Sequence, residues 1–333
     1  MPKLYLHAGT YKTGTTALQK FAHANRMELL ARGVFYADYG KDPMPLPFGH
    51  HRFALAVTRQ KTEVIERLTR IVEHWKTVAE TEGVPVLFSS ENLFMRRLES
   101  ASPYWEARTA YMQRLADLLE SFDVEPIIVY RRPDDFARSL YQERVTNGLK
   151  RLPKFHEWIA NGDPMLEYTK NTSIIAEKFR NGHHFIYEEL SNDQGIYAGF
   201  FDSIGVSIEG LETPSVVRKS LSPAETVIKN YANKFISAVP EGRDFVNWMR
   251  QENLAREIEE SHKHKLALWR SPKERADFLA SRKEDIEQLR KKFFSDRGDA
   301  KLFPELQEGD AVYEVPQLPH TVIAEVEKYF KER

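Results

Sequence analysis

The start of the chain combines an apolar strand, a loop of glycine, threonine and lysine, and an amphipathic helix within residues 4–19. Backbone N–H groups of such a loop and of the first helical turn point into one concavity, where the helix dipole favours an anion. Lys12 adds a mobile positive charge, and Thr15 and Thr16 add hydroxyl donors. The sequence therefore predicts a phosphate-binding loop that joins the first strand of a sheet to a helix.

The loop differs from a Walker A motif in the place of its lysine. A Walker A motif reads Gly-x-x-x-x-Gly-Lys-Ser/Thr. Gly9 and Gly14 keep this separation, but Thr15 stands where the lysine is required, and Lys12 lies inside the loop instead. The segment Tyr-Lys-Thr-Gly-Thr-Thr at 11–16 resembles the 5′-phosphosulfate loop of sulfotransferases that use 3′-phosphoadenosine 5′-phosphosulfate (PAPS). Loops of that family typically read Pro-Lys-x-Gly-Thr-Thr, so a tyrosine replaces the usual proline here.

A second phosphate-binding element is predicted after a buried strand at 124–130. This segment is a short, β-branched apolar run, as expected of a parallel strand. It is followed by Arg131 and, eight residues later (139 − 131 = 8), by Ser139 on the next predicted helix. The arrangement is similar to the 3′-phosphate element of the same sulfotransferase family. Arginine offers a planar fork of donors to phosphate oxygens, and Ser139 would add a hydroxyl on the same side.

Predicted strands and helices alternate through the first two thirds of the chain, which favours a doubly wound parallel sheet. Beyond about residue 215 the chain is charged and helical. We therefore expect an α/β PAPS-binding core with a P-loop-like phosphate-binding loop at 1–215, and a helical C-terminal region at 216–333. Further strands are expected at 34–36, 85–91 and 184–190, and helices at 15–32, 60–82 and 102–122. Ligand groups of such a sheet gather at the carboxyl ends of its strands.

The composition of the chain agrees with a soluble enzyme of the cytoplasm. The length of 333 residues, 41% of them hydrophobic, is enough for one large α/β core. The absence of cysteine excludes a disulfide scaffold and thiolate metal sites. A net charge of −1 argues against nucleic acid as a partner. No apolar run approaches the length of a membrane span, so no membrane span is expected.

The resemblance implies transfer of a sulfuryl group from PAPS to a hydroxyl or amine of an acceptor, which leaves 3′-phosphoadenosine 5′-phosphate (PAP). Lys12 is expected to stabilise the leaving phosphate, and no metal is expected because Lys12 and backbone donors neutralise it. In the family the base is a histidine or a glutamate, and the chain offers His50, His51 and Glu91 in the corresponding places. We favour a histidine, which titrates near neutrality, with Glu91 positioning the acceptor or Lys12.

The residues assigned to the donor nucleotide come from the loop, from the second element and from a basic segment late in the chain that matches the family only loosely. They are Thr10, Tyr11, Lys12, Thr13, Gly14, Thr15, Thr16, Arg131, Ser139 and Arg218. Tyr187 and Glu188 resemble the family's late Tyr-Glu-x-Leu ending and are interpreted as structural.

Two other functions stay open. A small-molecule kinase of the P-loop class would bind Mg-ATP, but it needs a lysine directly before serine or threonine, which this loop lacks. A nucleotide-binding scaffold without catalysis would keep the loop but not the candidate bases. The acceptor is equally open, and a carbohydrate, a lipid-linked glycan and a small alcohol all remain candidates. The near-neutral pI of about 6.9 makes a long polyanionic glycan less attractive. The oligomeric state is open as well.

Overall fold

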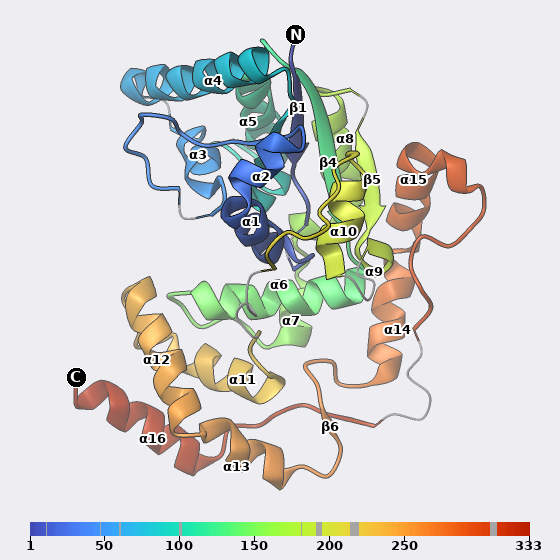
Figure 1. The fold of residues 1–333 in the computed structure, drawn as a ribbon. Helices are drawn as coiled ribbons and strands as arrows, with labels where there is room; N and C mark the ends of the chain where they lie inside the picture. The colour runs from blue at the N-terminus through green and yellow to red at the C-terminus, as the bar shows by residue number, and fades with distance from the viewer. Residues whose placement is uncertain are drawn as a thin grey trace. The chain divides into compact units, whose positions relative to one another are not determined.

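A computed structural model shows two compact units (Figure 1). Unit 1 consists of Met1–Arg132, Glu167–Val217 and Asp285–Pro304, and unit 2 of Pro133–Leu166, Arg218–Glu284 and Glu305–Arg333. The structure describes residues 1–10, 12–46, 48–59, 61–99, 102–180, 182–190, 195–213, 220–306 and 312–333. Of the predicted site residues, Tyr11 and Arg218 lie outside these ranges.

Unit 1 is built on a five-stranded sheet in the order β2-β3-β1-β4-β5, in which all neighbouring strands are parallel. The strands are β1 (Lys3–His7), β2 (Phe35–Tyr36), β3 (Val86–Ser89), β4 (Asp123–Tyr130) and β5 (His183–Ile186). In the centre of the sheet, Leu4 is in register with Val86 on one side and with Val124 on the other. The expected α/β fold with a parallel sheet is confirmed.

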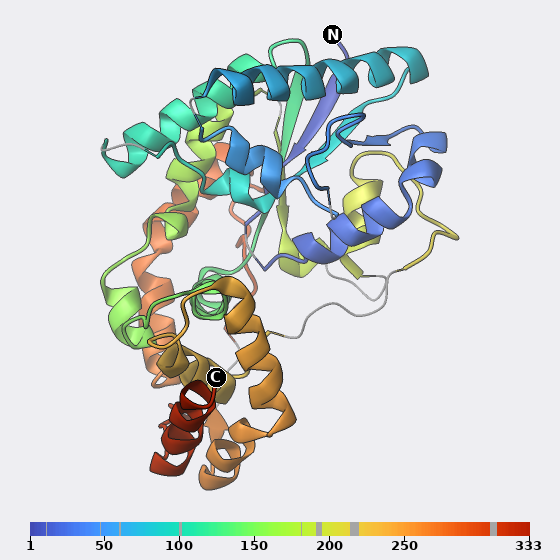
Figure 2. The ribbon, with the colours of Figure 1, turned by 90° about the vertical axis from the view of Figure 1, so that its left-hand side faces the viewer.

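Helices cover both faces of this sheet, as Figure 2 shows. Successive side chains of a strand point to opposite faces. Leu87 of β3 therefore packs on one face, in a core cluster that includes Phe21 of α1 (Thr15–Ala24) and Phe200 of α10 (Gly195–Asp202). Phe88 faces the other way, where its ring centroid lies 5.2 Å from that of Trp75 on α4 (Thr62–Glu82). Burial on both faces explains why β3 reads as a continuous apolar run.

Two expected elements of unit 1 differ from the observed ones. The helix expected at 15–32 is broken into α1 and α2 (Arg26–Ala31) at Asn25, whose amide donates to the carbonyl oxygens of Phe21 and Glu212. The strand expected at 184–190 ends at Ile186 and continues as the short helix α9. The other helical elements of this unit are α3 (His51–Ala56), η1 (Glu91–Phe94), α5 (Tyr104–Leu118), α8 (Tyr168–Ala176), α9 (Tyr187–Leu190) and η3 (Ser295–Arg297). Most of α15 (Lys283–Phe293) also belongs to this unit, which resumes at Asp285.

Unit 2 is mainly helical, and it includes a segment that the sequence placed in the N-terminal core. Residues 133–166 belong here because α6 packs on α11, where Gln142 Nε2 donates to the Leu221 carbonyl oxygen at 2.6 Å. Its helical elements are α6 (Pro133–Asn147), α7 (Phe155–Ala160), η2 (Pro164–Leu166), α11 (Pro223–Ala232), α12 (Val239–Gln251), α13 (Leu254–Ser261), α14 (Pro272–Ser281) and α16 (His320–Lys331). Two short parallel strands, β6 (Lys265–Leu266) and β7 (Tyr313–Glu314), were not expected.

Ser222 caps the start of α11. Ser222 Oγ accepts a hydrogen bond from the backbone N–H of Glu225, and the Glu225 carboxylate accepts one from the Ser222 backbone N–H, at 3.1 and 2.7 Å. This reciprocal capping box satisfies two donors at the start of α11. Within the described ranges, no helix is both long enough and apolar enough to cross a membrane.

Candidate functional site

The loop after β1 lies along the carboxyl end of β4. The backbone N–H groups of Ala8 and Thr10 donate to the carbonyl oxygens of Ile127 and Val129, at 2.9 and 3.1 Å. Thr10 Oγ1 also donates to the Val129 oxygen, and Thr13 Oγ1 donates to the Thr10 carbonyl oxygen at 2.7 Å. The loop therefore begins as an extension of the sheet. The hydroxyl protons of both threonines are used to hold it in shape.

The second half of the loop turns through left-handed backbone conformations into α1. Lys12 has a φ of 63° and Gly14 a φ of 72°, and only glycine adopts this region without steric cost. Gly14 is the N-cap of α1, with no side-chain hydrogen bond to the first turn. Thr15 is buried and Thr16 half-buried at the first two helical positions, and Thr15 Oγ1 lies 3.3 Å from Thr13 Oγ1.

Arg131, directly after β4, connects the two predicted phosphate elements. Its Nη1 donates to the carbonyl oxygen of Lys12 at 2.9 Å, and its guanidinium lies 5.2 Å from the centre of the Tyr187 ring. The backbone N–H of Arg132 donates to Glu188 Oε1 at 3.0 Å, and burial raises the pKa of that carboxyl. Tyr187 and Glu188, which we interpret as structural, thus contact the two arginines that follow β4.

His50 lies in the core of unit 1 and has both ring nitrogens engaged by the backbone. Nε2 is 2.7 Å from the Ala37 carbonyl oxygen, and Nδ1 is 3.0 Å from the backbone N–H of Ser89. A single neutral tautomer satisfies both, with Nε2 as donor and Nδ1 as acceptor. The side chain is completely buried, and this burial lowers the pKa of His50 to about 4. We therefore no longer retain His50 as a candidate base.

His51, one residue later, begins α3 and faces Glu91 at the carboxyl end of β3. His51 Nε2 lies 3.5 Å from Glu91 Oε2, and His51 Nδ1 lies 3.1 Å from Ser90 Oγ. The side chains of His51 and Glu91 are 30% and 12% exposed, so both are accessible to solvent. The structure brings together one histidine and one glutamate of the three candidate bases.

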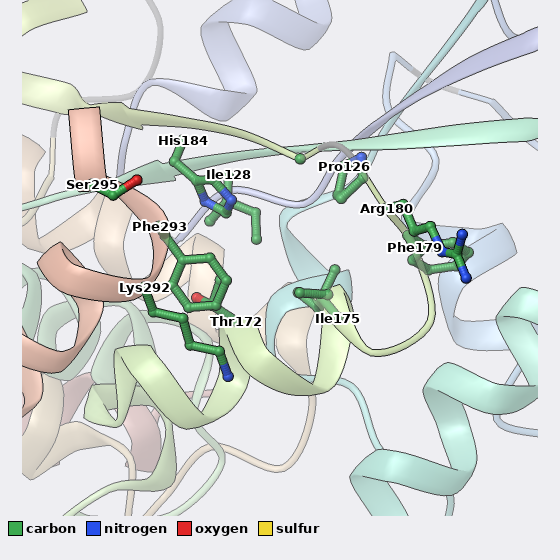
Figure 3. Close-up of a pocket in the computed structure, with 12 residues that line it drawn as sticks. Pro126, Ile128, Thr172, Ile175, Phe179, Arg180, His184, Lys292, Phe293 and Ser295 are labelled. Atoms are coloured by element: carbon green, nitrogen blue, oxygen red, sulfur yellow. The ribbon is translucent and has the colours of Figure 1, made fainter.

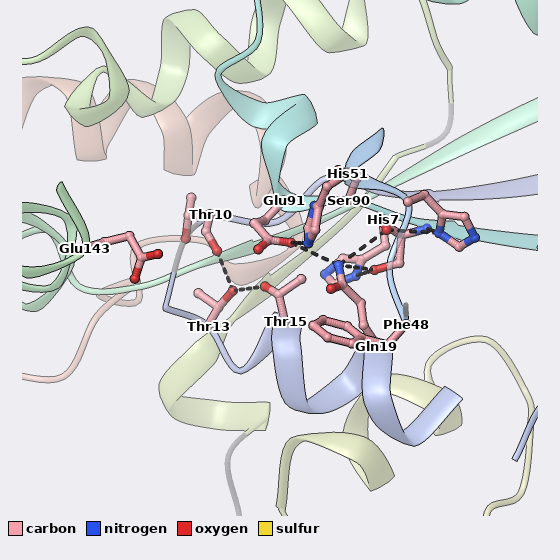
Figure 4. A network of polar contacts seen from close by, with 12 residues as sticks. His7, Thr10, Thr13, Thr15, Gln19, Phe48, His51, Ser90, Glu91 and Glu143 are labelled. Atoms are coloured by element: carbon pink, nitrogen blue, oxygen red, sulfur yellow. Dashed lines mark hydrogen bonds and ion pairs between the residues drawn. The ribbon is translucent and has the colours of Figure 1, made fainter. Parts of the chain in front are cut away.

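Two buried polar residues complete this cluster, and the sequence analysis missed both. Gln19 Nε2 donates to Glu91 Oε2 at 2.9 Å and lies 3.2 Å from Ser89 Oγ, which is 2.8 Å from His7 Nδ1 (Figure 4). Burial lowers the pKa of His7 to about 3, so its ring is neutral. The available signal was a glutamine on the buried stripe of an amphipathic helix and a histidine inside an apolar strand.

No protein-family model matches the chain. A search of curated proteins likewise finds no match.

The structure does not bring all the predicted site residues together in one unit. Ser139 lies on α6 in unit 2, where its side chain is buried, whereas the described residues of the loop, Arg131, His51 and Glu91 all belong to unit 1. Tyr11 and Arg218 are outside the described residues. In the part of the chain that the structure describes, no three His, Asp or Glu side chains are grouped as a metal site would require.

Unit 1 also contains a cavity of about 450 Å³ that is separate from these residues (Figure 3). Its apolar wall includes Ile128 and Ile175, and Phe293 and Lys292 of α15 lie at its other side. His184 points into it, with Nδ1 3.0 Å from the Tyr130 hydroxyl, and burial lowers its pKa to about 4. None of the predicted site residues lines this cavity.

Proposed function

We propose that this protein is a sulfotransferase that moves the sulfuryl group of PAPS to a hydroxyl or amine of an acceptor. The observation that carries the proposal is the hydrogen bond from Arg131 Nη1 to the Lys12 carbonyl oxygen. It joins two motifs that resemble the 5′-phosphosulfate loop and the 3′-phosphate element of this family. These motifs lie 119 residues apart in the chain.

The donor set of the loop suits a phosphate ester. Lys12 and Arg131 are cations, the first turn of α1 offers backbone N–H groups, and the N-cap Gly14 carries no side chain that would occupy them. When bound, PAPS supplies a sulfuryl group already joined to a good leaving group, the 5′-phosphate. Lys12 and Arg131 would hold the two phosphates, and the ammonium of Lys12 would stabilise the charge that develops on the leaving oxygen.

The cluster at the end of β3 supplies a base for the acceptor. An acceptor hydroxyl forms a bond from its oxygen to sulfur, the bond from sulfur to the phosphate oxygen breaks, and the hydroxyl proton goes to a protein group. Glu91 and His51 are the groups that qualify by position and exposure. The acceptor classes remain those that the sequence leaves open: a carbohydrate, a lipid-linked glycan or a small alcohol.

The first test is thermal unfolding of the full chain with PAP, beside Mg-ATP at equal concentration. A ligand at about 100 times its Kd stabilises a protein by about 2.7 kcal/mol, which raises the Tm by several degrees. We expect PAP to raise the Tm, and Lys12→Ala and Arg131→Ala to abolish the shift. Lys20→Ala removes a lysine that lies on α1 and not in the loop. It is the matched control and should keep the shift.

Two outcomes would count against the proposal. A shift with Mg-ATP alone would replace it with the kinase function. A PAP shift that survives in both Lys12→Ala and Arg131→Ala would place the nucleotide elsewhere on the protein.

A further inference from the structure

The two carboxylate oxygens of Glu91 have different surroundings. Oε2 accepts a hydrogen bond from Gln19 Nε2 at 2.9 Å and lies 3.5 Å from His51 Nε2. Oε1 receives no hydrogen bond from the residues that the structure describes. Oε2 therefore has a hydrogen-bond donor in Gln19 and an imidazole beside it, which can orient the carboxylate, whereas Oε1 has no such contact among the described residues.

Gln19 is itself held rigidly. It is completely buried on α1, and its Nε2 lies within 3.3 Å of the Ser89 carbonyl oxygen as well as of Ser89 Oγ. Since the amide donates to Ser89 Oγ, the hydroxyl proton of Ser89 is directed at Nδ1 of the neutral His7. The chain of hydrogen bonds from His7 through Ser89 to Gln19 therefore ends with an N–H group of Gln19 that points at Glu91 Oε2.

We propose that Gln19 is a positioning residue, which fixes Glu91 through Oε2 so that Oε1 takes the proton of the attacking acceptor. This inference rests on the proposed sulfotransferase function. His51 is the second positioning group on the same oxygen. Gln19 follows Thr15 by one helical turn on α1, so the helix whose N-terminus faces the phosphate also aligns the proton acceptor.

Gly49 offers a way to disturb Gln19 without replacing it. A Cβ atom built on Gly49 would lie 2.4 Å from Gln19 Oε1 and 2.6 Å from its Cδ. The Gly49→Ala variant must therefore push the carboxamide out of its place. Two independent changes, Gln19→Met and Gly49→Ala, should thus release Glu91 in the same way.

The test measures the conversion of PAPS to PAP by the full chain, with water as the acceptor. Water attacks sulfur, the bond from sulfur to the phosphate oxygen breaks, and the water proton goes to Glu91 Oε1, which gives sulfate and PAP. We expect Gln19→Met and Gly49→Ala to lower kcat by at least about 10-fold, with the KM for PAPS and the PAP-induced Tm shift unchanged. Asn25→Ala removes a buried amide at the far end of the same helix and should leave kcat unchanged.

The outcomes separate the inference from the function on which it rests. If wild-type protein binds PAP and turns over PAPS while Gln19→Met and Gly49→Ala keep the wild-type kcat, the positioning role is overturned and the function stands. If wild-type protein shows neither a PAP shift nor turnover, the sulfotransferase proposal itself fails. An equal loss of kcat in Asn25→Ala would also overturn the inference, because general loosening of α1 would then explain the effect. Should Gln19→Met not fold, Gly49→Ala decides.

Discussion

The guanidinium of Arg131 donates from Nη1 to the carbonyl oxygen of Lys12, 2.9 Å away. Arg131 directly follows the longest strand of the sheet, and Lys12 lies in the loop after the central strand, with a left-handed backbone. A carbonyl oxygen held by arginine turns the peptide of Lys12 in one direction. The contact therefore gives Arg131 a structural task in addition to its proposed contact with a phosphate.

The variant Arg131→Lys tests whether the shape of the guanidinium group matters in addition to its positive charge. Lysine keeps the positive charge, but its three donors share one nitrogen, so it lacks the separated planar donors that let arginine reach the Lys12 oxygen and a phosphate together. We expect Arg131→Lys to weaken PAP binding about tenfold, which corresponds to about 1.4 kcal/mol. Calorimetric titration measures the Kd, with Arg132→Lys as the neighbouring control. Equal affinities for Arg131→Lys and wild type would contradict the role of the fork.

The buried histidines make the stability of the protein depend on pH. Burial lowers the pKa of His50 to about 4, whereas an unfolded histidine titrates near 6.5. Between these values the unfolded state binds a proton that the folded state does not, so stability falls as the pH is lowered from 6.5 to 4. At pH 4 the loss from His50 alone is about 3 kcal/mol.

Urea unfolding at several pH values measures this dependence. The variant His50→Gln should be less stable than wild type at pH 7.5, because it disturbs two buried hydrogen bonds. Its stability should nevertheless fall less steeply between pH 6.5 and pH 4. Parallel curves for the two proteins would show that His50 does not titrate as its burial requires.

A buried ion pair is predicted to control the stability of unit 2. Arg275 Nε lies 2.5 Å from Asp134 Oδ2, and the two side chains are 11% and 0% exposed. Arg275→Met leaves the carboxylate buried without this partner, which costs about 3 kcal/mol. The free energy of unfolding in urea measures the loss. Lys273→Met, which breaks an exposed pair with Asp277 on the same helix, is the control, and an equal effect of both variants would refute the prediction.

The capping box of α11 predicts a smaller and more specific effect. Ser222→Ala removes the oxygen that accepts from the Glu225 backbone N–H, which costs about 1 kcal/mol. Ser222→Asp keeps an acceptor at the same place and should retain most of the stability. Thermal unfolding of the three proteins compares them, and an Asp variant as unstable as the Ala variant would argue against the cap.

Local patterns in the sequence determined the α/β class and the loop after the first strand. Strand β4, expected at 124–130, is observed at Asp123–Tyr130, because a short β-branched apolar run suits a parallel strand that is buried on both faces. The capping box at Ser222 is a local feature of the same kind, since its contacts span three residues. Features of this kind depend on neighbours in the chain.

The tertiary structure decided what neighbours in the chain cannot. His50 and His51 are adjacent in sequence, yet one is sealed in the core by Ala37 and Ser89, and the other faces Glu91. Gln19 becomes a partner of Glu91 only because the parallel pairing of β1 and β3 brings their carboxyl ends together. Burial and contacts between distant segments arise from the packing of the whole sheet, and the non-periodic segment before α3 does not encode which of the two histidines will be enclosed.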